Sequence, residues 1–373
     1  MDLSKVRIGL ALSGGGIRAA IFHLGALQYL AEAGLFGKIA SVSSVSGASL
    51  CIGAIFAVND NKWPAGDAFL HSVRPKVSGL ILHHDIQKSA LRRLPISPNL
   101  WWNRVELIAR VLEDKWCIKG TLQDLPQKPY WEINCTTFET GKRFRFRRDF
   151  MGDDTVGYVQ TPKLLISHMI AASAGFPVLI GPYILKTEGL RWTKDKWGKE
   201  GRASVDEQYS LWDGGVYDNL GLEALYKIGR GLDAEIDFLI VSNASAHISH
   251  KERRGNVSLS NMIRLLDISM SQVNSLRTRQ VCSSVMSKGR GMYLKIGNSA
   301  EDVAREFGIP PENAKAIVKK CLSQKDVAIV RDYATTLNTP SLENFERIFR
   351  HGYENAKCVH IFGEMMRQTI LNP

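Results

Sequence analysis

Three short segments of the chain carry residue types that could together catalyse acyl transfer. Residues 13–16 read Ser-Gly-Gly-Gly, Ser46 offers a hydroxyl group as nucleophile, and Asp213 stands directly before two glycines. Backbone N–H groups of glycines at a helix start can bind an anion, either a phosphate or the oxyanion of a tetrahedral intermediate. Each segment also has a plainer interpretation as a structural turn, so only their combination is informative.

Ser46 lies where a nucleophile elbow would place it. An apolar, strand-like run over 39–45 leads into Ser46-Gly47, and a helix of small and apolar residues follows. The usual elbow reads G-x-S-x-G, whereas here Ser44 and Ala48 stand at the two glycine positions. Both substitutes are small, as the crowded turn requires.

Asp213 is predicted to lie on a loop at a strand end, because Gly214 and Gly215 follow an aromatic and apolar stretch. The alternative is an Asp-Gly turn without catalytic meaning. After this segment we expect a helix over 220–228, with Asp218 or Asn219 as its N-cap.

The predicted elements that position these residues alternate between strand and helix. Strands are expected over 6–12 and 39–45, and helices over 17–33 and 49–58. This order predicts an α/β fold with a central, mostly parallel sheet flanked by helices. The remaining expectations are a helical cap-like insertion over 59–128, strands over 130–136, 142–147 and 236–242, a helix over 164–174, a polar loop over 183–204, a mainly helical part over 246–373, and one domain over 1–373.

The composition favours a protein with an anionic partner. The net charge is +11, which suits anionic lipid headgroups or nucleic acid. The six cysteines form no C-x-x-C pair and none has a histidine at zinc-ligand spacing, so no metal site is expected. We find no signal peptide and no run of about 18–20 apolar residues, which predicts a cytoplasmic protein with peripheral membrane contact.

An alternative function is a nucleotide- or nucleic-acid-binding module that uses the glycine run and the basic surface. The chain has neither G-x-G-x-x-G nor Gly-Lys-Ser/Thr at this run, and no nucleic-acid-binding motif. We therefore do not expect nucleic acid as a partner.

Taken together, the three segments resemble those of the patatin-like phospholipases, which share their catalytic layout with mammalian cytosolic phospholipases. The order S-G-G-G-x-R, then x-x-S-G-x-S about thirty residues later, then D-G-G carries the resemblance. Residues 23–27, 171–177 and 352–353 agree with bacterial members. The resemblance is good over about 6–58 and 130–245 and loose elsewhere, and Ser44 departs from the family's glycine.

The resemblance implies a catalytic dyad without histidine and without a cofactor. Ser46 would be the nucleophile, Asp213 its base, and Arg18 would bind the phosphate of the lipid headgroup. The N–H groups that would hold the oxyanion belong to Gly14, Gly15, Gly16 and Gly47.

A phospholipid membrane surface is the expected partner. Four tryptophans near basic residues are candidate membrane contacts, namely Trp101, Trp102, Trp192 and Trp197. Some bacterial members of the family are membrane-degrading effectors of antiphage signalling that cyclic nucleotides activate. By this resemblance a cyclic-nucleotide activator is a further expected partner, although no motif marks its site.

Overall fold

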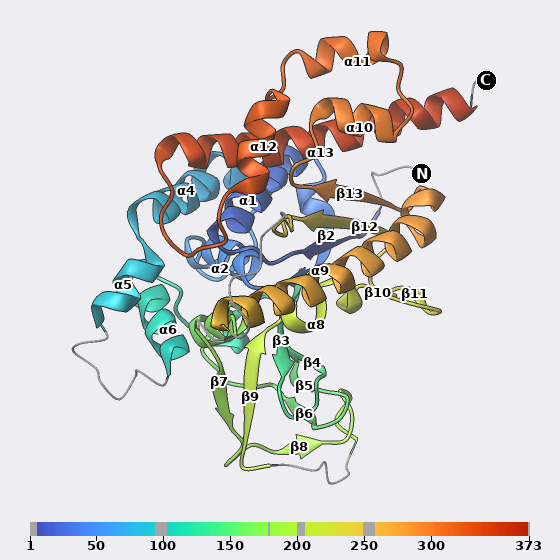
Figure 1. Ribbon diagram of the computed structural model, residues 1–373. Coiled ribbons are helices and arrows are strands. Elements are labelled where there is room, and N and C mark those ends of the chain that lie inside the picture. Colours follow the sequence, from blue (N-terminus) through green and yellow to red (C-terminus); the bar gives the residue numbers. More distant parts are fainter. Residues whose placement is uncertain (1–5, 94–102, 178–179, 200–205, 249–257, 372–373) are drawn as a thin grey trace.

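The computed structural model describes residues 6–93, 103–177, 180–199, 206–248 and 258–371 and has one mixed sheet at its centre (Figure 1). The strands of this sheet are β1 (Ile8–Leu12), β2 (Ile39–Ser44), β3 (Tyr130–Thr137), β4 (Arg143–Phe146), β5 (Phe150–Asp153), β6 (Gly157–Gln160), β7 (Tyr183–Lys186), β8 (Trp192–Thr193), β9 (Gln208–Asp213), β12 (Phe238–Asn243) and β13 (Gly291–Lys295). The parallel part has the order β13-β12-β1-β2-β3. An antiparallel part continues through β4, β5, β6 and β8, and β9 pairs with β3 and β7.

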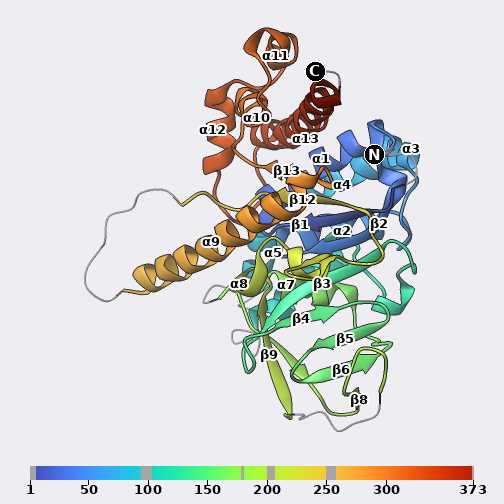
Figure 2. The same cartoon turned by 90° about the vertical axis from the view of Figure 1, so that its right-hand side faces the viewer.

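Helices pack on both faces of the sheet (Figures 1 and 2). They are α1 (Gly16–Glu32), α2 (Gly47–Ala57), α3 (Gly66–Ala68), α4 (Arg74–His83), α5 (Ile86–Arg93), α6 (Arg104–Lys115), α7 (Ile166–Ser173), α8 (Gly215–Asp218), α9 (Leu259–Ser284), α10 (Ala300–Glu306), α11 (Pro311–Val318), α12 (Gln324–Asp332) and α13 (Leu342–Leu371). Because successive side chains of a strand point to opposite faces, Leu10 and Leu12 join the larger core with α1 and α2. Ala11 faces the smaller core, which includes Leu220 and, from α9, Val281.

Helices α1 and α13 cross at two glycines. A Cβ on Gly25 would come within 2.0 Å of the Phe349 carbonyl oxygen, and one on Gly352 within 2.0 Å of the Phe22 carbonyl oxygen. Glycine is therefore required at both positions for this close approach of the two backbones. The crossing brings together residues 23–27 and 352–353, two segments that are far apart in the sequence.

The predicted α/β fold is confirmed. The described residues of the insertion over 59–128 are mainly helical, with α3 and α4 packed beside α1, and α6 packed between α5 and α7. Two local expectations are wrong. The expected loop over 183–204 contains β7 and β8, because these strands extend the antiparallel part of the sheet through β9 and β6. The helical C-terminal part also contributes β13 to the sheet.

The expected helix over 220–228 is the second error. This segment forms a short 3-10 turn (Leu222–Ala224) and then β10 (Tyr226–Lys227), which pairs with β11 (Gly231–Leu232). Gly221 has a left-handed conformation with φ 63°, and Leu222 and Leu225 pack into the smaller core. Tertiary packing thus overrides the helical propensity of the Leu-Glu-Ala-Leu sequence.

Candidate active site

Ser46 lies on a tight turn between β2 and α2. Its backbone angles, φ 53° and ψ −118°, are a combination that residues with a Cβ rarely adopt. Strain of this kind persists where the surrounding structure enforces it, often at functional sites. A Cβ on the next residue, Gly47, would come within 2.0 Å of the Gly16 carbonyl oxygen. The elbow and the glycine loop therefore touch backbone to backbone.

Asp213 ends β9 and is held beside Ser46 by hydrogen bonds. The Thr136 hydroxyl donates to the Asp213 carbonyl oxygen at 2.9 Å, and the Gly215 N–H donates to the carboxylate at 2.7 Å. The Ser46 side chain lies close enough to this carboxylate to influence its ionisation. Burial raises the pKa of Asp213 to about 6, although the interactions with Gly215 and Ser46 oppose this shift. A carboxylate with such a pKa is a better proton acceptor than an ordinary one.

The glycine loop lies directly against Ser46. A Cβ on Gly14 would come within 3.1 Å of the Ser46 Cβ, and Gly15 and Gly16 have φ values of 146° and 63° that favour glycine. The N–H of Gly14 donates to the Asn219 carbonyl oxygen at 3.1 Å, so this group shapes the loop. Of the four glycines predicted for the oxyanion hole, Gly15, Gly16 and Gly47 therefore remain as candidate donors.

A chain of buried hydroxyl groups supports the elbow from behind. The Ser46 N–H donates to Ser173 Oγ at 3.0 Å, and Ser173 Oγ donates to the Asn134 carbonyl oxygen at 2.8 Å. Ser49 Oγ lies 3.0 Å from Ser173 Oγ and 2.9 Å from Ser44 Oγ. The sequence analysis missed this chain, and its only signals were the serines of 41–49 and the Ala-Ala-Ser segment of 171–173.

This chain also explains the serine at the first glycine position of the elbow. Ser44 Oγ accepts a hydrogen bond from Trp131 Nε1 at 2.9 Å, so the hydroxyl is fully accommodated beside β3. Ser44 therefore adds a support to the elbow rather than loosening it.

The family model for patatin-like phospholipases matches residues 10–226, which is more than half of the chain. The chain belongs to the patatin-like phospholipase family. The matched region includes the glycine loop, Ser46, Ser173 and Asp213. A search of curated proteins finds no significant match.

Two solved structures are similar to this chain. Human GIVD cytosolic phospholipase A2 matches with a TM-score of 0.53 and 14% identity, over 99% of this chain and 61% of that chain. VipD from Legionella pneumophila matches with a TM-score of 0.40 and 16% identity, over 96% of this chain and 67% of that chain. The chain thus spans about three-fifths of the length of the phospholipase A2, and the likeness concerns the fold alone.

Arg18 of this patatin-like site is buried beneath residues 333–336, which we call the strap. Its guanidinium donates to the carbonyl oxygens of Tyr333 and Ala244 and to the Thr335 hydroxyl. The Ile17 N–H donates to the Thr336 carbonyl oxygen at 2.8 Å, so the strap also caps the first turn of α1. Burial lowers the pKa of Arg18 to about 10, which leaves it charged at neutral pH. This placement favours a positioning role for Arg18 over the expected headgroup role.

His23 is a structural residue near the glycine loop. Its Nε2 lies 2.9 Å from the Ser13 carbonyl oxygen and must donate, so Nδ1 accepts from the Ser242 hydroxyl. Burial lowers the pKa of His23 to about 4, so the ring is neutral at physiological pH. Within the described ranges, no hydrogen bond joins a histidine to Ser46 or Asp213.

The predicted membrane contacts differ in exposure. Trp192 packs edge-on against Tyr209 and is half-buried, whereas Trp197 is 81% exposed with the Lys196 ammonium over its ring. Trp101 and Trp102 lie outside the described residues. Of the expected tryptophans with a described position, Trp197 alone has the exposure that a membrane contact needs.

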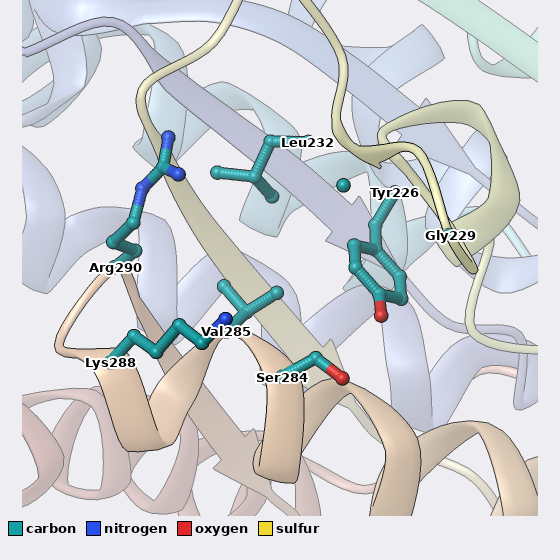
Figure 3. A pocket seen from close by; sticks show the side chains of 8 residues that line it. Tyr226, Gly229, Leu232, Ser284, Val285, Lys288 and Arg290 are labelled. Atoms are coloured by element: carbon teal, nitrogen blue, oxygen red, sulfur yellow. The ribbon is translucent and has the colours of Figure 1, made fainter.

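Two surface cavities lie away from the dyad. One of about 270 Å³ is lined by Tyr226, Ser284, Lys288 and Arg290 near the C-terminal end of α9 (Figure 3), and the other lies beside Glu132. Neither cavity is lined by Ser46 or Asp213.

Across the described part of the chain, no helix combines the length and apolar character that crossing a bilayer requires. The same residues contain no group of three or more His, Cys, Asp or Glu side chains placed to hold a metal ion.

Proposed function

We propose that the protein is a lipid acyl hydrolase that cleaves fatty-acyl esters of membrane phospholipids with a Ser46–Asp213 dyad. The observation that carries this proposal is the placement of Ser46, on its strained elbow, against the glycine loop and close enough to the buried carboxylate of Asp213 to lower its pKa. Family membership supports a lipid ester as substrate.

The reaction would proceed through an acyl-enzyme. Ser46 Oγ attacks the ester carbonyl carbon while its proton passes to Asp213, and the oxyanion forms beside the N–H groups of Gly15, Gly16 and Gly47. The C–O bond to the alcohol then breaks, and Asp213 returns the proton to the leaving lysophospholipid. Water attacks the acyl-enzyme, again giving a proton to Asp213, and the fatty acid leaves as Ser46 recovers its proton.

The decisive experiment measures fatty-acid release from phospholipid vesicles by the wild type, Ser46→Ala and Asp213→Asn. We expect Ser46→Ala to lose activity by at least about a thousandfold, as removal of an essential nucleophile does. A fluorophosphonate probe should add covalently to the wild type at Ser46, as mass spectrometry of the labelled peptide would show. The matched control is Ser167→Ala, a buried serine on α7 that bonds Glu113 instead of the elbow. Hydrolysis that survives Ser46→Ala would rule out this nucleophile.

Regulated membrane degradation, as in an antiphage effector, is a finer form of this proposal. Ser46 is only 9% exposed, which supports a resting state that must open before a lipid can enter. Vesicle hydrolysis with and without a panel of cyclic di- and trinucleotides tests it. An increase of at least about tenfold with one nucleotide is expected, whereas an active wild type with equal rates throughout would contradict regulation by these ligands.

A further inference from the structure

Helix α9 exposes apolar side chains on its outward face. Among the described residues, large apolar side chains are exposed at Met262 (62%), Leu265 (65%), Leu276 (59%), Ile268 and Val273 of this one helix. An exposed apolar stripe on a folded protein usually marks a surface that meets another molecule or a membrane. Figure 2 shows that the first half of α9 projects from the body of the protein, so this stripe is accessible.

The opposite side of α9 is anchored beside the dyad. Met270 packs against Gly215, where a Cβ would come within 3.1 Å of the Met270 Cε, and Gly215 donates to the Asp213 carboxylate. Asn274 donates to Ser245 Oγ at 2.9 Å, and Arg277 bonds Glu223 at 3.2 Å. The body-facing side of the helix is thus fixed, and the apolar side faces outward next to the active site.

The charges of α9 suit an anionic surface. The helix contains three arginines and a single acidic residue, Asp267. At 3.6 residues per turn, Asp267 lies on the side opposite Leu265 and Leu276, because it precedes Leu276 by two and a half turns. Arg279 follows Leu276 by three residues and shares its face, and it is exposed. The outward face therefore combines apolar side chains with a cation and has no carboxylate.

We propose that the outward face of α9, formed by Met262, Leu265, Ile268, Val273 and Leu276, docks the protein on an anionic phospholipid bilayer. The choice of a bilayer as partner rests on the proposed lipid hydrolase function, since the helix lies beside the dyad. The helix lies in the interface and does not cross the membrane, in keeping with its insufficient apolar length. The dyad is then held at the headgroup level, where the ester bonds of the lipid are.

The test is flotation of the full chain carrying Ser46→Ala with vesicles of phosphatidylcholine and phosphatidylglycerol. We expect the added changes Met262→Gln, Leu265→Gln and Leu276→Gln to reduce the partition coefficient at least tenfold. The matched control replaces Leu91, Ile228 and Leu342 by Gln, three side chains of similar exposure (55%, 70% and 59%) on other elements. This control should bind vesicles as the parent does. Unchanged binding of the α9 variant, or no vesicle binding by the parent, would overturn the proposal.

A soluble ester separates this inference from the proposed function. With Ser46 intact, the α9 variant should hydrolyse a short-chain, monomeric ester at the wild-type rate while losing at least tenfold on vesicles. If the wild type cleaves neither substrate and yet binds vesicles through α9, the hydrolase proposal fails and docking stands. Light scattering tests the remaining candidate partner, which is a second copy of the chain. A wild-type dimer that the α9 changes convert to a monomer would identify the face as a contact between two copies and overturn docking.

Discussion

The two sides of the dyad are supported by different parts of the chain. The elbow over 39–57 is held by β3 and α7, through the buried hydroxyl chain that reaches Ser46 from Ser173. The glycine loop is held by Asn219, by Ala244 and by the strap, which comes from the C-terminal helical part. Local strain at Ser46 is thus balanced by a dense network of buried hydroxyl groups from α7 and its neighbours, while the glycine loop depends on the strap, which lies still farther away in sequence.

Because of this difference, substitutions on the two sides of the dyad should have different effects on activity and stability. Changes on the elbow side alter the nucleophile and its base, so they should reduce the chemical step for every ester. Changes on the loop side alter where the oxyanion donors lie, so they should also affect every ester, but less strongly and together with stability.

Asp213→Asn tests the elbow side with the largest expected effect. We expect activity on any ester to fall by at least about a thousandfold, because an amide cannot accept the Ser46 proton. Stability should rise at the same time. The pKa of Asp213 is raised to about 6 by burial, so ionisation destabilises the fold as the pH increases from about 4 to 6, by about 3 kcal/mol.

The stability part is checked by urea unfolding of both proteins at pH 4 and pH 8. The variant should be more stable than the wild type at pH 8, and the difference should shrink at pH 4, where the buried carboxyl group of the folded wild type is neutral. A difference that stays the same at both pH values would show that Asp213 is not a destabilised carboxylate.

The pH profile of the wild type gives the next largest effect. The kcat/KM for a soluble ester should fall about tenfold per pH unit below about 6, because protonated Asp213 cannot act as a base. Measuring the apparent pKa at two temperatures identifies the group, since a carboxyl pKa barely moves on warming and an imidazole pKa falls. A strongly temperature-dependent value would point to a histidine.

Ser173→Ala probes the hydroxyl chain. The Ser46 N–H loses its acceptor in a buried setting, so we expect the unfolding free energy to fall by about 1–3 kcal/mol and kcat to fall by about 10- to 100-fold. The comparison is Ser167→Ala on the same helix, which should lose stability and keep kcat. If both variants keep full kcat, the network does not position Ser46.

Arg18→Met tests the loop side and has the smallest expected effect. Loss of the bonds to the strap and to Ala244 should lower kcat/KM by about tenfold, equally for phospholipids and for a short uncharged ester. The unfolding free energy should fall by about 2 kcal/mol, because buried carbonyl groups lose their donors. A loss confined to phospholipids would restore the headgroup role for Arg18.

The sequence was informative where strand, turn and helix follow one another directly. The strand–glycine–helix unit around residues 13–16 and the unit around Ser46 have local signals, and the structure has both. By contrast, Ser173 meets Ser46 across 127 residues, and the strap meets Arg18 across 315. Such contacts leave no trace in composition or periodicity, so the burial of Arg18 beneath the strap could not be predicted from its place in the first turn of a helix. The prediction for the segment after Gly221 was wrong for a related reason, because packing against β1 determines the conformation of that segment.

The strap also sets a time at which the enzyme can become competent during its synthesis. The glycine loop, Ser46 and Asp213 all leave the ribosome well before residues 333–336, yet the Ile17 N–H and the Arg18 guanidinium find their partners only in that late segment. A nascent chain that already contains the whole dyad therefore still has a glycine loop without its contacts to the strap. The proposed lipid hydrolase would in this way be kept inactive until residues 333–336 have been synthesised.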